Sequence, residues 1–380
     1  MRRIAIISTS RADFFLLNTL ANELLNSDLI QVDFIATAGL LTEDNSKVLN
    51  LMKGHEQLNI IKIYFDIKTS TNRSISESIS NGITKFSNFF SKNKYETVIV
   101  LGDRYELLSI AIPALNERIP ITHIHGGEIT LGSMDDYYRN AISKMSRVHF
   151  TATESSKKRV IQMGESPEMV FNVGSLGIQN IINESFYSKG ELSQLIDFDF
   201  EKVYAVATFH PETSSEEDYI NNLYVILDSF KEYSSINFLV THTNKDLHGD
   251  KMNKILDEFK STNIKIIDSL GQYYLSALKH SAFVIGNSSS GIIEAPSLKL
   301  QTINLGIRQS GRERAKSVRN CAIQKDKIIK CIDATLQKKE YPKDFFSNPY
   351  FKANTAQLIT KHLLNLTNNK IFIQKGFYDL

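Results

Sequence analysis

The chain has 380 residues, 42% of them hydrophobic and 23% charged, so it is long enough to bury two ordinary cores. Lysine and arginine total 44 against 42 acidic residues, and this net charge of +2 argues against nucleic acid or a membrane surface as a partner. No stretch approaches the roughly 18 uncharged apolar residues of a membrane span. The apolar run near the start breaks at Ser8, too early for a signal peptide. Cys321 and Cys331 fit neither a disulfide framework nor a CxxC metal site, so we expect a reduced, cytoplasmic protein.

Short β-branched runs alternate with longer amphipathic segments, which is typical of parallel strands joined by crossover helices. In the first half we expect strands at 3–8, 32–37, 96–102, 120–125, 148–153 and 169–174. A second series lies at 203–210, 236–242, 264–268, 283–286 and 301–306. Helical spacing fills intervening segments such as 104–117. The pattern predicts an α/β fold of two doubly wound, Rossmann-like domains in succession.

Two glycines and a group of polar residues in 174–191 indicate the hinge between these domains. We expect an N-terminal domain over 1–175 and a C-terminal domain over 176–347. The last segment, 348–380, has helical spacing and could pack back on the first domain. If the two domains face each other, the carboxyl ends of both sheets line one crevice, where a ligand should bind.

Four polar clusters directly follow predicted strands. They are STSRAD (8–13), LGDRYE (101–106), HIHGGEITLGSMDDYYRN (123–140) and GNSSSGIIE (286–294). Any one of them could be only a turn and a helix cap, because Ser, Asp and Gly are favoured at such junctions. Four clusters at the same topological end favour a binding site.

GNSSSGIIE is the clearest candidate for binding an anion. Gly286 permits a tight turn, and Ser288 and Ser289 could donate to a phosphate at the start of the next helix. The stretch is neither a Walker loop nor a GxSxG elbow. Glu294 could accept from ribose hydroxyls, or it could be a charge in the first turns of the helix.

Two further side chains could reach the same phosphates. Arg308 follows the next predicted strand and a glycine, so it could form a second clamp. His210 ends a strand and precedes a proline that fixes the direction of the loop. A lone histidine in this position is usually structural, and its place at the mouth of the crevice makes it a candidate phosphate or sugar ligand.

We expect the two histidines of HIHGGE to lie on opposite faces of the strand at 120–125. His123 is the better candidate for the core, which leaves His125 to face the crevice. A single usable histidine beside carboxylates is a poor zinc site, so we expect no metal.

Several carboxylates converge on the first domain's part of the crevice. Glu128 and Asp136 lie in the same stretch as Arg139, and Asp103 joins them if sequential strands pair. Clustered carboxylates raise one another's pKa, which suits acid/base chemistry near neutral pH. A structural alternative is that Asp135 and Asp136 cap the helix and pair with Arg139.

The motifs SRADF, LGDRYE, HIHGGE…DD…R, FHPET, GNSSSGIIE and LGIRQSGRE resemble, in order and spacing, those of the UDP-N-acetylglucosamine 2-epimerase family. The resemblance spans residues 4–315 and is closer to the hydrolysing branch, which releases N-acetylmannosamine and UDP for sialic acid synthesis. It implies a GT-B arrangement, a UDP-sugar substrate, no nicotinamide or other cofactor, and a homodimer or homotetramer.

The resemblance also implies the surroundings of the substrate. Around the sugar it places Arg11, Asp103, Arg104, Glu128, Asp136 and Arg139, with His125 facing them. Around UDP it places His210, Asn244, Ser288, Ser289, Glu294 and Arg308. Three positions depart from the family pattern: Thr9 replaces a common glycine, His125 a glutamate found in several relatives, and Asn140 a histidine. The last two leave the identity of the sugar open.

We therefore expect elimination of UDP through a 2-acetamidoglucal, followed by hydration. Asp103 and Glu128 would be the essential acid/base pair, Asp136 would orient them, and Arg139 would balance charge. His210 would stabilise the departing UDP. Alternatives are a UDP-2,4-diacetamido-6-deoxy sugar as substrate, a non-hydrolysing epimerase, a GT-B glycosyltransferase, and a non-enzymatic nucleotide-sugar sensor, which the many ionisable groups argue against.

Overall fold

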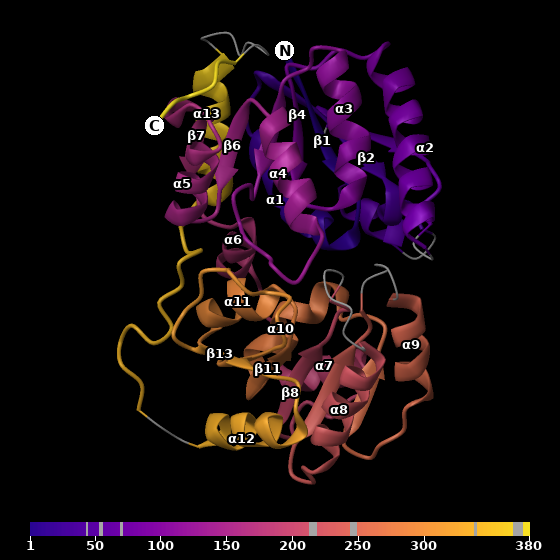
Figure 1. Ribbon diagram of the computed structural model, residues 1–380, viewed down its shortest axis with the longest axis vertical. Helices are drawn as coiled ribbons and strands as arrows, with labels where there is room; N and C mark the ends of the chain where they lie inside the picture. Colours follow the sequence, from indigo (N-terminus) through magenta and orange to yellow (C-terminus); the bar gives the residue numbers. More distant parts are fainter. Residues whose placement is uncertain are drawn as a thin grey trace. The chain divides into compact units, whose positions relative to one another are not determined.

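The computed structural model describes residues 1–42, 45–52, 56–68, 71–212, 219–243, 249–337, 340–367 and 375–380. These residues form two units, each with its own parallel sheet (Figure 1). Unit 1 comprises Met1–Glu128, Asp135–Asn180 and Lys352–Leu380. Unit 2 comprises Ile129–Met134 and Ile181–Phe351.

Unit 1 is built on a sheet of seven described strands in the order β3-β2-β1-β4-β5-β6-β7. The strands are β1 (Arg2–Ser8), β2 (Ile30–Thr37), β3 (Leu58–Ile63), β4 (Thr97–Leu101), β5 (Ile121–Ile124), β6 (Val148–Thr151) and β7 (Val170–Asn172). The helices are α1 (Arg11–Leu24), α2 (Asn72–Phe90), α3 (Leu108–Asn116), α4 (Asp135–Met145), α5 (Glu154–Gln162), α6 (Leu176–Asn183), which runs into unit 2, and α13 (Thr355–Thr367). The strand order reverses between β1 and β4, so the carboxyl ends of these strands form the switch point where doubly wound sheets bind ligands.

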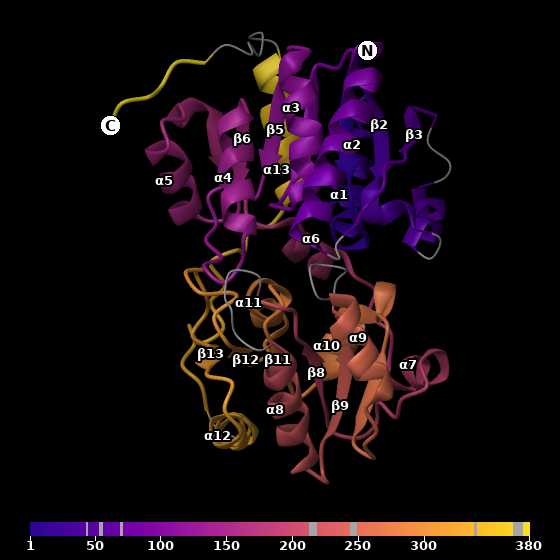
Figure 2. The same cartoon turned by 45° about the vertical axis from the view of Figure 1, so that its right-hand side comes forward.

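Both faces of the unit 1 sheet are buried, which explains why its strands are almost continuously hydrophobic. On β1, Ile4 and Ile6 belong to one core, and Ala5 and Ile7 belong to the core on the opposite face. Each of the buried isoleucines contributes roughly 1.5–3 kcal/mol to folding. The late helix α13 packs against α1 and adds Ile359 to the first core (Figure 2).

Unit 2 repeats the same winding in a sheet of six described strands, in the order β10-β9-β8-β11-β12-β13. The strands are β8 (Tyr204–Thr208), β9 (Asn237–Thr241), β10 (Ile264–Ile267), β11 (Phe283–Gly286), β12 (Thr302–Leu305) and β13 (Val318–Cys321). The helices are α7 (Lys189–Leu195), α8 (Tyr219–Lys231), α9 (Gly249–Glu258), α10 (Tyr274–His280), α11 (Ser290–Ile293) and α12 (Lys325–Leu336). Its switch point lies between β8 and β11.

The prediction of two doubly wound α/β domains is confirmed, since every pair of neighbouring strands in both sheets is parallel. Two strands were missed, β3 and β13, and both lie at the edge of a sheet. The strand expected at 120–125 ends earlier than predicted, at Ile124, so His125 lies in the loop after β5. The expected reason for the different surroundings of His123 and His125 was wrong, because residues two apart in a strand point to the same face; the end of the strand separates them instead.

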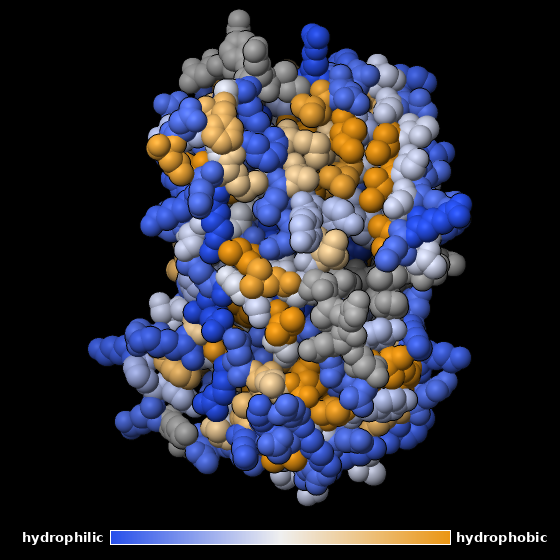
Figure 3. All heavy atoms as spheres, in the orientation of Figure 1, coloured by the Kyte–Doolittle hydropathy of each residue, from blue (hydrophilic) through white to orange (hydrophobic). Residues whose placement is uncertain are grey.

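The surface of unit 1 carries hydrophobic side chains in short groups separated by hydrophilic ones, on the face seen in Figure 3. Among the described residues, no helix combines the length and the hydropathy that crossing a bilayer requires. The polar groups that could do chemistry are concentrated instead in the loops after the strands.

Candidate functional site

Two arginines expected near the sugar come from the first loops of the unit 1 switch point. Arg11 is the first residue of α1, directly after a capping box in which the Ser10 hydroxyl and the Asp13 carboxylate bond each other's backbone amides. Arg104 follows β4, and its Nη2 donates to Oε1 of the buried Glu106 at 2.9 Å. Both arginines are half-buried. The capping box fixes the backbone at Arg11, and the contact with Glu106 orients the guanidinium of Arg104.

Arg139 brings the predicted carboxylates together. It lies on α4, is 1% exposed, and pairs through Nη1 with Asp136 and through Nη2 with Asp103. Nη1 also donates to the backbone carbonyl of Glu128 at 2.7 Å. Burial alone would lower the pKa of the guanidinium, but the carboxylates of Asp103, Glu128 and Asp136 raise it above its ordinary value. A shared cation therefore offsets the mutual repulsion that we expected among these acids.

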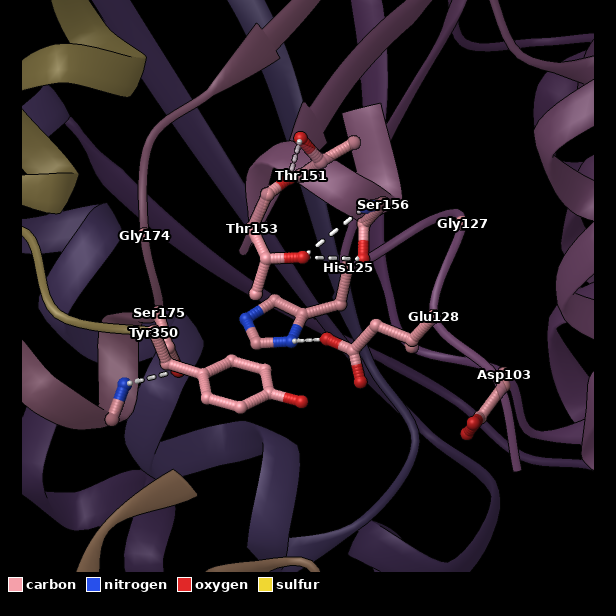
Figure 4. A network of polar contacts seen from close by, with 12 residues as sticks. Asp103, His125, Gly127, Glu128, Thr151, Thr153, Ser156, Gly174, Ser175 and Tyr350 are labelled. Atoms are coloured by element: carbon pink, nitrogen blue, oxygen red, sulfur yellow. Dashed lines mark hydrogen bonds and ion pairs between the residues drawn. The ribbon is translucent and has the colours of Figure 1, made fainter. Parts of the chain in front are cut away.

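His125 and Glu128 form a second contact, in the loop after β5. The His125 ring points its Nδ1 at Oε1 of Glu128, 2.8 Å away (Figure 4). Both residues are buried: His125 is 8% exposed and Glu128 is 5% exposed. His125 has a φ of +67°, a left-handed conformation that costs a residue other than glycine about 1–2 kcal/mol. Its backbone N–H donates to the carbonyl of Phe150 at 2.8 Å, which holds it in this conformation.

The two glycines after His125 let this loop pack against α4 and α5. A Cβ on Gly126 would lie 2.8 Å from the Ser143 hydroxyl. Gly127 has a φ of +77°, and a Cβ there would lie 2.3 Å from the carbonyl oxygen of Ser156. Arg159 donates from Nη1 to the Gly127 carbonyl at 2.9 Å. The loop is thus fixed on both sides before any ligand binds.

His123 lies in the core, as predicted, with no exposed surface. Its Nε2 lies 2.7 Å from the carbonyl of Gly102, which can only accept, so Nε2 carries the hydrogen and Nδ1 accepts from the Ser143 hydroxyl at 3.0 Å. Burial lowers the pKa of His123 to about 3, so the ring is neutral at pH 7. Its role is to hold the chain directly before Asp103.

In unit 2 a buried asparagine ties the two strands of the switch point together. Asn287 has no exposed surface; its Oδ1 accepts from the His210 amide at 2.7 Å and its Nδ2 donates to the His210 carbonyl at 2.8 Å. Its own carbonyl accepts from Nε2 of Gln309 at 2.9 Å and from Nη1 of Arg308 at 3.4 Å. The His210 ring contacts the Thr243 hydroxyl through Nδ1 at 2.6 Å. The structure therefore brings His210 and Arg308 to one end of the sheet.

Sequence reasoning missed the role of Asn287 and also that of Glu212. Oε1 of this buried side chain accepts from the backbone amides of Ile307 at 2.7 Å and Arg308 at 3.0 Å. It fixes the turn after β12 and with it the start of the Arg308 side chain. The available signal was its position, directly after His210 and Pro211 at the end of a predicted strand. A carboxylate that becomes buried there needs hydrogen-bond donors, and backbone amides of a neighbouring loop can provide them.

The serine loop differs from our prediction in its helix. Ser289 precedes α11, which spans only four residues, so its macrodipole is small and loop donors must provide most of any anion binding. Ser288 and Ser289 are half-buried. Glu294 ends α11 rather than lying one to two turns inside a longer helix. Gly286, with a φ of +138°, makes the turn possible.

Two predictions about unit 2 concern a ligand residue and metal binding. Asn244 lies outside the described residues. Among the residues that the structure describes, His242, Asp257 and Asp268 form the one group that could hold a cation, and none of them was a predicted site residue. The side chains of the two aspartates are 61% and 93% exposed, as in an ordinary surface pair. The absence of a functional metal stays a prediction.

The two sheets and their switch points define a two-domain α/β protein of the GT-B type. The chain belongs to the UDP-N-acetylglucosamine 2-epimerase family, whose model matches residues 22–364. The fold of a solved structure described as UDP-GlcNAc 2-epimerase from Neisseria meningitidis bound to UDP-GlcNAc agrees, with a TM-score of 0.77 at 20% identity over 96% of this chain and 100% of that one.

Two curated relatives align with the chain over its whole length. Polysialic acid biosynthesis protein P7 of Escherichia coli is 38% identical over 100% of this chain and 98% of its own length. The GDP/UDP-N,N'-diacetylbacillosamine 2-epimerase (hydrolyzing) of Campylobacter jejuni is 34% identical over 100% of this chain and 99% of its own. The resemblance inferred from the motifs is thereby confirmed at the level of the family.

Proposed function

We propose that the protein is a hydrolysing 2-epimerase that converts UDP-N-acetylglucosamine and water into N-acetylmannosamine and UDP for nonulosonic acid synthesis. The observation that carries the proposal is full-length similarity, at 38% and 34% identity, to a polysialic acid biosynthesis protein and to a relative named as hydrolysing. The acid/base cluster around Arg139 supports it, because binding alone does not need so many ionisable groups.

The proposed chemistry follows from the weak acidity of the proton on C2 of the sugar. No carbonyl on a neighbouring ring carbon stabilises a carbanion there, so inversion requires a leaving group on C1, and UDP is one. As the C1–O bond breaks, Arg308, His210 and the loop of Ser288 and Ser289 would stabilise the negative charge on UDP. Removal of the C2 proton gives a 2-acetamidoglucal, and water then adds at C1 while a proton returns to C2 from the opposite face.

Side chains of unit 1 would surround the sugar in this proposal. Asp103 and Asp136 lie at the ends of the Arg139 guanidinium, each with about a fifth of its side chain exposed, so they can reach a ligand while staying paired. Arg11 and Arg104, on adjacent loops, would hold the sugar or balance its charge.

A second substrate is supported by a specific observation. The Campylobacter jejuni relative is named for UDP-N,N'-diacetylbacillosamine, and at 34% it is more similar than a UDP-N-acetylglucosamine 2-epimerase of Neisseria meningitidis at 29%. A UDP-2,4-diacetamido-6-deoxy sugar would undergo the same elimination and hydration, because both reactions occur at C1 and C2.

The test is to incubate the protein with each UDP-sugar alone in D2O and to follow the products by phosphorus and proton NMR. We expect equal amounts of UDP and a free 2-epimeric sugar with deuterium at C2. A UDP-linked epimer would show a non-hydrolysing enzyme. Release of UDP only after an acceptor is added would instead show a glycosyltransferase, and unchanged UDP-sugars would contradict the proposal.

A further inference from the structure

The Nε2 atom of His125 is the part of unit 1 that the reaction proposed above leaves unexplained. It is buried, and it has no hydrogen-bond partner among the described residues. A buried polar nitrogen without a partner is costly, so it requires an explanation such as a bound water, an ion or a catalytic role. The backbone of His125 also has a positive φ, in the fixed loop that continues with Gly126 and Gly127. Strained residues of this kind cluster at functional sites.

The contact with Glu128 decides the chemical state of the ring. An ionised carboxylate can only accept, so Nδ1, 2.8 Å from Oε1, carries the hydrogen. In the neutral ring this leaves a lone pair on Nε2. A histidine whose one nitrogen is oriented by a carboxylate and whose other nitrogen is free has the arrangement of a general base.

We propose that His125, through Nε2, is the group that exchanges the proton on C2 of the sugar, and that Glu128 is its positioning residue. This rests on the proposed function and changes the expected roles, in which Glu128 itself was essential to proton transfer. The Nε2 lone pair takes the C2 proton as the C2–H electron pair forms the C1=C2 double bond. The C1–O bond breaks and its electron pair leaves with UDP, so the imidazolium gains the one proton that the sugar loses.

The charged groups around His125 favour this cycle. Glu128 faces it from the same loop, and Asp103 follows the neighbouring strand β4 (Figure 4). From α4 and α5, Arg139 and Arg159 donate to the backbone carbonyls of Glu128 and Gly127, not to the ring. The carboxylate in direct contact therefore stabilises the imidazolium formed by proton transfer, while the arginines hold the backbone.

The first experiment compares His125→Asn with Glu128→Gln. Asparagine tolerates a positive φ but cannot act as a base, so His125→Asn should lower the rate of C2 deuterium exchange at least ~100-fold. Glu128→Gln keeps an acceptor for Nδ1 and loses the charge, so its loss should be smaller. Glu128→Asp, which keeps the carboxylate, should recover part of the exchange that Glu128→Gln loses.

A chemical rescue separates proton transfer from a structural role. His125→Gly suits the positive φ and leaves a ring-sized space, so added imidazole should restore exchange in proportion to its neutral fraction. His362→Gln removes another unit 1 histidine, stacked on Phe171, and serves as the matched control that should keep the wild-type rate. Thermal melting of each variant checks the fold.

The outcomes distinguish this inference from the proposed function. If the wild-type protein releases no UDP from either UDP-sugar, the proposed function fails. If the wild-type protein is active and folded His125→Asn retains near-normal exchange, the assignment to His125 is overturned. Loss of activity in His125→Gly without rescue by imidazole would likewise overturn a proton-transfer role.

Discussion

At the scale of single residues, Asp103 is placed to take part in the chemistry through its pairing with the buried Arg139. Asp103→Asn keeps a hydrogen-bond acceptor for Arg139 but loses the charge and most of the basicity. We expect kcat to fall at least ~100-fold, the low end for losing a general acid or base. Glu117→Gln, which removes the charged partner of the exposed Lys94, is the control and should leave kcat unchanged. A turnover within threefold of wild type would show that Asp103 moves no proton.

His123 makes a prediction about stability and pH. Burial lowers its pKa from 6.5 to about 3, so between these values the unfolded chain binds a proton that the folded chain does not. Its contribution to stability is therefore fully present above pH 6.5 and is lost as the pH falls, by up to about 1.4 kcal/mol per pH unit. Urea unfolding between pH 6.5 and 4.5 should show a steeper loss for wild type than for His123→Gln, and parallel curves would refute this.

A third prediction concerns the residues proposed to hold UDP. Replacing Ser289 or Arg308 by alanine should weaken UDP binding by about 1–3 kcal/mol, the range for losing a hydrogen bond to a charged group. Calorimetric titration with UDP measures the change, and Ser193→Ala, on α7, is a control outside the switch point. Unchanged UDP affinity in both variants would remove these residues from the site.

Several proposed site residues could be grouped from the sequence, but the residues that hold the backbone around them could not. Asp103 could be grouped with Asp136 and Arg139 because it follows a predicted strand, and the other two lie one turn apart on the next helix; the structure joins all three. Asn287 and Glu212 were not found, because they act on backbone groups 77 and 95 positions away. No local pattern records such a bond, since it depends on which strands become neighbours.

At the scale of secondary-structure elements, every central strand was predicted, whereas two of the four edge strands, β3 and β13, were missed. Central strands are buried on both faces and therefore appear as β-branched hydrophobic runs. The edge strand β13 has the sequence VRNC with its two middle residues exposed, and β3, with the sequence LNIIKI, buries only its last residue, Ile63. Half-exposed edge strands resemble loops in composition, which is why both were missed.

The turn after β11 allows a prediction about stability at the scale of one element. Gly286 has a φ of +138°, and a Cβ there would lie 1.9 Å from the backbone oxygen of Thr208 on β8. Gly286→Ala should therefore cost about 2–5 kcal/mol, from backbone strain and overpacking together, and weaken UDP binding. Gly190→Ala is the matched control: it lies in α7 with open space around it and should stabilise by up to about 1 kcal/mol. Equal melting temperatures for the two variants would contradict the assignment of the turn.

At the scale of the whole molecule, one winding order occurs twice, and the sequence indicated this through two series of strands. The last segment was expected to be able to pack back on the first domain, and Lys352–Leu380 belong to unit 1 in the structure. That Ile129–Met134 belong to unit 2 was not predicted. Hydrophobic patterning reports which face of an element is buried and not which partner buries it. The place of α13 against α1 therefore needed the structure.

The last prediction concerns the reaction as a whole: turnover should need neither an added metal nor a nicotinamide. Elimination of UDP and addition of water leave the oxidation level of the sugar unchanged, so no hydride carrier is required, and the sequence has no GxGxxG fingerprint. Charge on the departing UDP can be met by Arg308, which needs no cation to assist it. We expect full activity after EDTA treatment and desalting. Inactivation that Mg²⁺, Mn²⁺ or Zn²⁺ reverses would refute this, and loss of that reversal in His242→Gln would place the cation at His242, Asp257 and Asp268.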